Sequence, residues 1–309
     1  MSLSAYVKIA RADHWFKNVF VLPGTAIAAV LSGAPIGDYA FGLLIGLASV
    51  CLVASANYVL NEWLDAEFDR FHPIKKHRPS VVGGLEPRWV YTEYALLTLA
   101  GLGLAASISP HFFAAAAALW GMAVLYNVRP FRTKDRIYLD VLSESVNNPL
   151  RLMLGWFVVT STPLPPSSLV LGYWMLGAYL MAVKRYAELR SIGPEVAGLY
   201  RRSFRHYTVE KLLISTLFYA SAASFFLGVF LVKHRIELLV TLPFIAVAFA
   251  WYLHIGMKVD SAASTPEQLY RERGFIAYLS FVVVVIGVAF VVDLPWLDWF
   301  LKNAFTHAN

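Results

Sequence analysis

Long apolar blocks recur along almost the whole 309-residue chain, and they restrict its fold more than any other feature. Hydrophobic residues make up 58% of the sequence and charged residues only 15%, whereas an ordinary soluble domain is roughly 45–50% apolar. A run of about 17 to 25 mostly apolar residues can cross a bilayer as a helix. The blocks therefore predict an integral membrane protein.

Nine of these blocks predict membrane-spanning helices. They cover residues 19–31, 41–60, 90–107, 112–126, 141–160, 169–183, 212–232, 238–257 and 275–292. The strands of a membrane barrel would alternate apolar and polar residues strictly, and these blocks do not. We therefore predict an all-α integral membrane fold. No linker or low-complexity segment divides the chain, so residues 1–309 are expected to form one polytopic domain.

The basic residues are distributed unevenly between the predicted spans. A net charge of +6 could indicate a nucleic-acid partner. However, if the nine spans alternate in direction, most of the 26 basic residues fall on one side of the membrane. By the positive-inside rule this side is cytoplasmic. We expect no nucleic acid, but a bacterial-type inner-membrane protein with its active site facing the cytoplasm.

A first group of polar side chains follows the second predicted span without a helix breaker. Asn61, Asp65 and Asp69 lie four residues apart, so a continuing helix stacks them on one face with Glu62 beside them. Oxygen ligands of this kind hold Mg²⁺ while substrate phosphates complete its octahedron. We expect Asn61, Glu62, Asp65 and Asp69 to bind Mg²⁺. A solvated helix end with local salt bridges is the alternative.

Basic residues lie immediately downstream of this motif. Lys75 and Arg78 supply ammonium and guanidinium donors for phosphate oxygens, and the fork of Arg78 suits bidentate binding. Both are expected to bind substrate.

A second polar group opens the fifth predicted span. On a helix, Asp140, Glu144, Asn148 and Arg151 fall on one face that runs into the bilayer, and Asn147 lies nearby. We expect Asp140 and Glu144 to bind metal, and Asn148 and Arg151 to bind substrate. Hydrogen bonding between helices is the alternative, because polar groups also stabilise membrane bundles.

The first motif resembles the NDxxDxxxD signature of the UbiA superfamily of intramembrane prenyltransferases, and residues 72–79 extend the match. The resemblance implies nine transmembrane helices around a lipid-accessible cavity and two acidic motifs that grip a Mg-pyrophosphate. Glu62 and Glu144 stand where many members have Asp, but both keep a carboxylate.

Two flanking elements resemble one branch of this superfamily, the decaprenyl-phosphate phosphoribosyltransferases. Lys17 and Asn18 belong to a WxKN element, whereas Lys184, Arg185 and Glu188 belong to a KRxxEL element. The resemblance implies that all five bind substrate. Surface anchoring is the alternative for the basic residues, and a local pair with Lys184 is the alternative for Glu188.

This branch implies Mg²⁺-dependent transfer of phosphoribose from phosphoribosyl diphosphate to a polyprenyl phosphate. Asp65, Asp69 and Asp140 are the expected catalytic residues, because metal held there neutralises the charge of the departing pyrophosphate. The attacking lipid phosphate is already anionic, so the reaction needs no strong general base to remove a proton from it.

Three other functions remain open at this point. An aromatic polyprenyltransferase would use the same clamp on a polyprenyl diphosphate. A transporter would favour charges near the bilayer midplane. A non-catalytic lipid-binding protein would tolerate Asp65→Asn.

Overall fold

The computed structural model describes residues 3–297, and every regular element within that range is helical. The chain divides into two compact units. Unit 1 comprises Met1–Pro165 and Ile192–Lys211, and unit 2 comprises Pro166–Ser191 and Leu212–Asn309.

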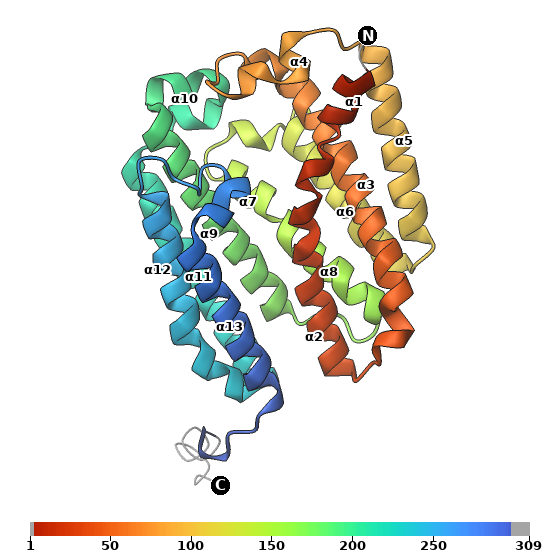
Figure 1. The fold of residues 1–309 in the computed structure, drawn as a ribbon, viewed down its shortest axis with the longest axis vertical. Coiled ribbons are helices and arrows are strands. Elements are labelled where there is room, and N and C mark those ends of the chain that lie inside the picture. Colours follow the sequence, from red (N-terminus) through yellow and green to blue (C-terminus); the bar gives the residue numbers. More distant parts are fainter. Residues whose placement is uncertain (1–2, 298–309) are drawn as a thin grey trace. The chain divides into compact units, whose positions relative to one another are not determined.

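Unit 1 contains the first part of the chain and one returning segment (Figure 1). Its α-helices are α1 (Leu3–Ile9), α2 (Leu22–Ser32), α3 (Ile36–Asp69), α4 (Pro79–Val82), α5 (Pro87–Ala106), α6 (Pro110–Asn127), α7 (Leu139–Ser145), α8 (Asn147–Val159) and α10 (Pro194–Tyr200). Its 3₁₀ helices are η1 (Ala12–Val21), η2 (Lys75–His77), η3 (Thr133–Asp135) and η4 (Arg202–Arg205).

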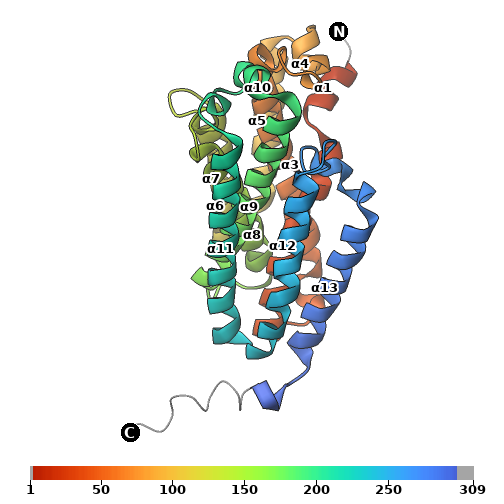
Figure 2. The same ribbon diagram turned by 90° about the vertical axis from the view of Figure 1, so that its left-hand side faces the viewer.

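Unit 2 holds most of the remaining chain. Its elements are α9 (Ser167–Ile192), α11 (Val209–His234), η5 (Ile236–Thr241), α12 (Leu242–Gly256), η6 (Pro266–Arg271) and α13 (Arg273–Val291), with a few end residues of α9 and α11 belonging to unit 1. α12 packs against α13, as Figure 2 shows for the two blue helices. The ring of Tyr252 lies 5.9 Å from that of Phe275 at this contact.

The helix α3 positions the first acidic motif. It packs against α5, α6 and α8 and runs unbroken for 34 residues. At about 1.5 Å per residue it is about 51 Å long, well beyond a hydrocarbon core of about 30 Å. The prediction that the helix continues through Asn61, Asp65 and Asp69 is therefore confirmed, and the motif occupies its last turns.

The second motif departs from the expected single helix over residues 141–160. α7 ends at Ser145 and α8 begins at Asn147, with Val146 between them. Pro149 has no backbone N–H and cannot bond to the carbonyl of Ser145, so the ladder is interrupted there. Proline is tolerated in the first turn of α8 because amides at that position lack intrahelical acceptors.

Helices α2 and α8 approach each other closely through two glycines. A Cβ atom at Gly24 would clash with the carbonyl of Leu152, and one at Gly155 would clash with the carbonyl of Val21. Small residues of this kind allow membrane helices to pack backbone to backbone. The contact fixes α8, and with it Arg151, against η1 and α2.

Five stretches of the described chain are long and apolar enough to span a membrane. They are Ser4–Ser32, Ile36–Asp69, Val209–His234, Ile236–Gly256 and Arg273–Val291. All nine predicted segments lie on helices, apart from a few end residues and the short breaks between elements.

Candidate active site

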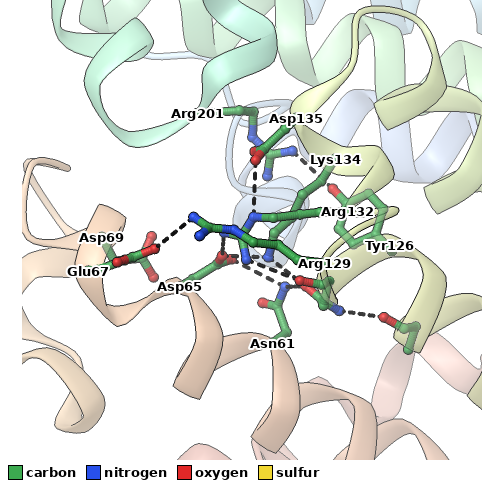
Figure 3. A network of polar contacts seen from close by, with 12 residues as sticks. Asn61, Asp65, Glu67, Asp69, Tyr126, Arg129, Arg132, Lys134, Asp135 and Arg201 are labelled. Carbon is green, nitrogen blue, oxygen red and sulfur yellow. Dashed lines mark hydrogen bonds and ion pairs between the residues drawn. The ribbon is translucent and has the colours of Figure 1, made fainter.

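Asp65 lies at the centre of the polar network in unit 1 (Figure 3). Its Oδ1 accepts a hydrogen bond from Arg132 Nη2 at 2.9 Å and another from Lys134 Nζ. Its Oδ2 accepts one from Asn61 Nδ2 at 3.2 Å. The two cations come from the segment between α6 and α7, so a loop far along the chain completes the first motif.

Asn127, at the end of α6, ties these groups together. Its Oδ1 accepts from both Asn61 Nδ2 and Lys134 Nζ, each at 2.6 Å, and its backbone carbonyl accepts from Arg132 Nη1 at 3.1 Å. Arg132 Nε also donates to Asp135 at 3.1 Å. The side chains of Arg132 and Lys134 are only 8% and 3% exposed.

Burial acts directly on the chemistry of Lys134. Burial, together with the positive charges of Arg132 and Arg201, lowers the pKa of Lys134 to about 8, although the negative charge of Asp65 raises it. Lys134 remains a cation at neutral pH because Asp65 accompanies it. The charge states of Lys134 and Asp65 therefore depend on each other.

Glu62 and Asp69 share a different cation, Arg78. Arg78 Nη1 donates to Asp69 Oδ2 at 2.5 Å, and its Nε lies 4.0 Å from Glu62 Oε2. Ser80 Oγ donates to Glu62 at 3.4 Å. Glu62 and Asp69 are both buried. Arg78, a predicted substrate-binding residue, therefore hydrogen-bonds to one predicted metal ligand, Asp69, and lies next to another, Glu62.

Lys75 lies near the same end of unit 1. Its ammonium group stacks over the ring of Tyr200, 5.1 Å from the centroid. Tyr200 belongs to α10, so the returning segment of unit 1 meets the basic residues that follow α3.

In the second motif, Asp140 is fully buried and binds hydroxyl groups. Its Oδ1 accepts from Tyr207 at 2.6 Å and its Oδ2 accepts from Ser203 at 3.1 Å. The Tyr207 oxygen in turn accepts from the backbone N–H of Tyr138 at 2.8 Å. Asp140 thereby fixes the returning segment around η4 to the start of α7.

Glu144 is linked to the first motif through α6. Its Oε2 accepts from the hydroxyl of Tyr126 at 2.6 Å, and Arg201 Nη1 donates to the same hydroxyl oxygen at 3.0 Å. Tyr126 precedes Asn127, which contacts Asn61. Adjacent residues at the end of α6 therefore bring the two acidic motifs into one network.

Arg151, the last residue of the second motif, contacts η1. Arg151 Nε donates to Asn18 Oδ1 at 3.1 Å, and Asn18 Nδ2 donates to Cys51 Sγ at 3.2 Å. Asn148 is half-buried in the first turn of α8. Lys17 Nζ lies 2.8 Å from His14 Nδ1. The structure thus joins the predicted residues Asn18 and Arg151, which are 133 positions apart in the sequence.

Lys184, Arg185 and Glu188 lie on α9 in unit 2. Arg185 Nη1 donates to Glu188 Oε2 at 3.1 Å, and both side chains are buried. Glu188 therefore has a local partner in Arg185, three positions before it, whereas the alternative weighed from the sequence named Lys184.

Sequence reasoning missed several members of the network, among them Tyr126, Asn127, Arg132, Lys134 and Arg201. It counted the basic ones as charges that set membrane topology. Their position at the ends of helices that neighbour the acidic motifs is the signal that could have identified them. Arg132 also has a φ of 32°, an uncommon conformation for a non-glycine residue that is found often at functional sites.

The predicted ligands fit Mg²⁺ in chemistry but do not form a closed cage. Carboxylate and amide oxygens are the donors that Mg²⁺ prefers, and it is commonly held by one or two carboxylates together with substrate phosphates. Among residues 3–297, no three His, Cys, Asp or Glu side chains are grouped to hold a metal ion. Substrate phosphates would therefore have to complete the coordination.

A profile of the UbiA prenyltransferase family matches residues 19–282. An all-helical membrane fold and a network of acids and cations agree with this match. The chain belongs to the UbiA prenyltransferase family, and it is a membrane-embedded transferase of the prenyltransferase type.

Two relatives give a more specific comparison. The chain is 30% identical to the decaprenyl-phosphate phosphoribosyltransferase of Mycolicibacterium smegmatis, over 68% of this chain and 64% of that protein. It is 31% identical to the protein of the same name from Mycobacterium tuberculosis, over 67% of each. The chain thus spans just under two thirds of the first relative.

A solved structure shows the shared fold. The UbiA homologue of Archaeoglobus fulgidus bound to GPP and Mg²⁺ matches with a TM-score of 0.70 and 22% identity, covering 92% of this chain and 100% of that one.

Proposed function

We propose that the chain transfers 5-phosphoribose from phosphoribosyl diphosphate to a decaprenyl-like polyprenyl phosphate in a Mg²⁺-dependent reaction that releases pyrophosphate. The observation that carries this proposal is the network in which Asp65 binds Arg132 and Lys134 while Tyr126 and Asn127 link it to Glu144. Two anionic substrates require carboxylates for metal and several cations for phosphate. The names of the two mycobacterial relatives support this choice of substrates.

The metal ligands in this proposal are Asn61, Glu62, Asp65, Asp69, Asp140 and Glu144, of which Asp65, Asp69 and Asp140 are the catalytic residues. When bound, Mg²⁺ would neutralise negative charge on the pyrophosphate. That the Archaeoglobus homologue was solved with Mg²⁺ supports the choice of metal.

The chain's own residues orient the substrates. Arg78 and Lys75 lie where they can donate to pyrophosphate oxygens, and Arg132, Lys134 and Arg201 add positive charge to the same region. A lipid phosphate oxygen then attacks the anomeric carbon. The bond from this carbon to the pyrophosphate oxygen breaks, and pyrophosphate leaves with the electron pair. The attacking oxygen is already anionic, so no side chain has to remove a proton.

The other predicted substrate-binding residues are Lys17, Asn18, Asn148, Arg151, Lys184, Arg185 and Glu188. We further propose one polytopic domain of nine transmembrane helices around a lipid-accessible cavity, in a bacterial inner membrane, with the site facing the cytoplasm. The excess of basic residues on one side of the predicted spans supports this orientation.

The test is a transfer assay on purified protein. Phosphoribosyl diphosphate labelled in the ribose is incubated with Mg²⁺ and polyprenyl phosphate, and label in the organic phase is counted. We expect label to appear only when both substrates and Mg²⁺ are present. Label transfer from a polyprenyl diphosphate to a phenolic acceptor, without lipid-linked phosphoribose, would instead establish the aromatic prenyltransferase alternative.

A further inference from the structure

Arg202, the first residue of η4, lies against the ring of Phe68 near the end of α3. Its guanidinium carbon is 5.8 Å from the ring centroid. The guanidinium carbon of Arg132 lies 4.8 Å from the centroid of the same ring. One half-buried aromatic side chain therefore carries two guanidinium groups, each attracted by the negative face of the ring.

The two arginines differ in what else they bind. Arg132 donates hydrogen bonds to Asp65 and to Asp135, and its side chain is buried. Arg202 is exposed, and within the described residues 3–297 it forms no hydrogen bond or ion pair. The N–H donors of its guanidinium are therefore open to an anion from outside the chain.

The residues on either side of Arg202 are fixed to other parts of unit 1. Arg201 Nη1 donates to the hydroxyl of Tyr126 at 3.0 Å, and Ser203 Oγ donates to Asp140 Oδ2 at 3.1 Å. Ser203 is fully buried. Because both neighbours are held, the backbone of Arg202 is held as well, and its position over the ring does not depend on the stacking contact alone.

The ring of Phe68 and the carboxylates of Glu62 and Asp69 lie on opposite sides of Asp65. Successive residues of α3 are about 100° apart around the helix axis, so Glu62 and Asp69 lie about 40–60° to one side of Asp65. Phe68 lies about 60° to its other side. Arg78 contacts Glu62 and Asp69. The predicted metal-binding face of α3 therefore lies between Arg78 and the guanidinium groups on Phe68.

The proposed substrates carry more phosphate groups than the pyrophosphate assigned to Arg78 and Lys75. Phosphoribosyl diphosphate also has a 5-phosphate, and the polyprenyl acceptor has one phosphate, so two phosphate monoesters need donors elsewhere. A guanidinium with free N–H groups binds two phosphate oxygens at once. Its planar fork is preorganised, so it loses little freedom when it binds. A polyprenyl diphosphate carries a pyrophosphate alone and would give Arg202 no such ligand.

We propose that Arg202, held over Phe68, binds a phosphate monoester of one of the two substrates and takes no part in binding the pyrophosphate. The assignment rests on the proposed function for the identity of these substrates. The 5-phosphate of the donor and the phosphate of the lipid acceptor present the same oxygens to the guanidinium, and the experiment distinguishes between them.

The experiment measures equilibrium binding to the purified full-length protein in the presence of Mg²⁺. Radiolabelled phosphoribosyl diphosphate, polyprenyl phosphate and inorganic pyrophosphate are tested separately. Arg202→Gln removes the charge, and Arg202→Lys keeps the charge without the fork. Arg88→Gln is the matched control, because Arg88 is also an exposed arginine stacked on an aromatic ring, that of Trp89 at 5.2 Å. Thermal unfolding establishes that each variant is folded.

We expect Arg202→Gln to weaken the binding of phosphoribosyl diphosphate or of polyprenyl phosphate by about tenfold or more, because charged hydrogen bonds are lost. Arg202→Lys should lose about threefold, since an ammonium group replaces only part of the bidentate contact. Affinity for pyrophosphate, and every affinity of Arg88→Gln, should stay within about twofold of the wild type. A loss for phosphoribosyl diphosphate assigns the 5-phosphate to Arg202, and a loss for polyprenyl phosphate assigns the acceptor phosphate.

Two results would overturn the assignment. One is unchanged affinity of Arg202→Gln for both phosphoribosyl diphosphate and polyprenyl phosphate. The other is an equal loss of affinity for inorganic pyrophosphate, which would show that Arg202 belongs to the pyrophosphate site.

Failure of the proposed function is distinguishable from these results. Binding of either phosphate monoester that depends on Arg202, in a protein that transfers no phosphoribose, would leave this assignment intact and refute the function. Normal transfer by Arg202→Gln with unchanged KM values for both substrates would refute the assignment and leave the function intact.

Discussion

The two acidic motifs of unit 1 differ in the hydrogen bonds that connect them to neighbouring elements. Asp65 and Asp69 of the first motif accept hydrogen bonds from Arg132, Lys134 and Arg78. Asp140 and Glu144 of the second motif accept hydrogen bonds from hydroxyl groups of tyrosine and serine.

The comparison shows what each set of hydrogen bonds can contribute. A carboxylate paired with a cation can exchange that cation for a metal, and the released cation can then turn to phosphate. The hydroxyl contacts of Asp140 also fix the segment that carries Tyr207 and Ser203 to the start of α7. Four changes test this distinction, in order of decreasing expected effect.

The largest effect should come from Asp65→Asn. Turnover should fall by more than about a hundredfold, since the site loses a preorganised charge. The free energy of unfolding should fall by about 3–5 kcal/mol, because Lys134 and Arg132 stay buried without their carboxylate. Both are measured with the transfer assay and by thermal unfolding in detergent.

The double variant Asp65→Asn/Lys134→Met is the control for stability. It removes the uncompensated cation and should recover part of the unfolding free energy while turnover stays low. Unchanged stability of the Asp65→Asn variant would show that the pairing of Asp65 with Arg132 and Lys134 does not stabilise the first motif.

Tyr207→Phe should have the next largest effect and should act mainly on stability. It removes a donor from a fully buried carboxylate, which costs about 1–3 kcal/mol. Thermal unfolding gives the value, and KM for both substrates should change little. A large loss of kcat in a fully stable variant would show that the Tyr207 hydroxyl serves the proposed catalytic role of Asp140 more than it holds the returning segment in place.

Tyr126→Phe tests the link between the motifs. Its hydroxyl joins Arg201 to Glu144, so kcat/KM should fall by about tenfold, as expected for the loss of a charged hydrogen bond. Tyr6→Phe is the matched control, since its hydroxyl accepts only a peripheral bond from Glu86 N in an exposed region. Equal kcat/KM values for the two variants would argue against the link.

The smallest effect is expected for Arg129→Gln. Arg129 lies 3.6 Å from Glu67, and both side chains are more than 60% exposed. Exposed pairs contribute about 0–1 kcal/mol. Unfolding and turnover should therefore match the wild type closely, and a strong loss of either would show that exposed cations also form part of the site.

The sequence was sufficient to predict the helical membrane fold and the stacking of the first motif. Apolar blocks and four-residue spacing act within one helix, so neither depends on knowledge of distant contacts. The break between α7 and α8 was only partly predictable, because Pro149 marks a weak point without showing that the helix divides there.

The partners of the carboxylates could not be predicted. Arg132, Lys134 and Arg201 read as topology signals in the sequence, because a basic residue next to a span has the same appearance whether it faces lipid headgroups or a buried acid. Only the packing of α6 against α3 and α7 shows that they face acids.

By itself, the sequence determined that the chain lies in a membrane, and it predicted which residues bind metal and phosphate, since both follow from composition and local periodicity. The tertiary structure decided which cations reach Asp65 and Asp69 and which hydroxyls reach Asp140 and Glu144. The physical reason is that most of these partners come from other helices and loops, which only packing brings close to the acids.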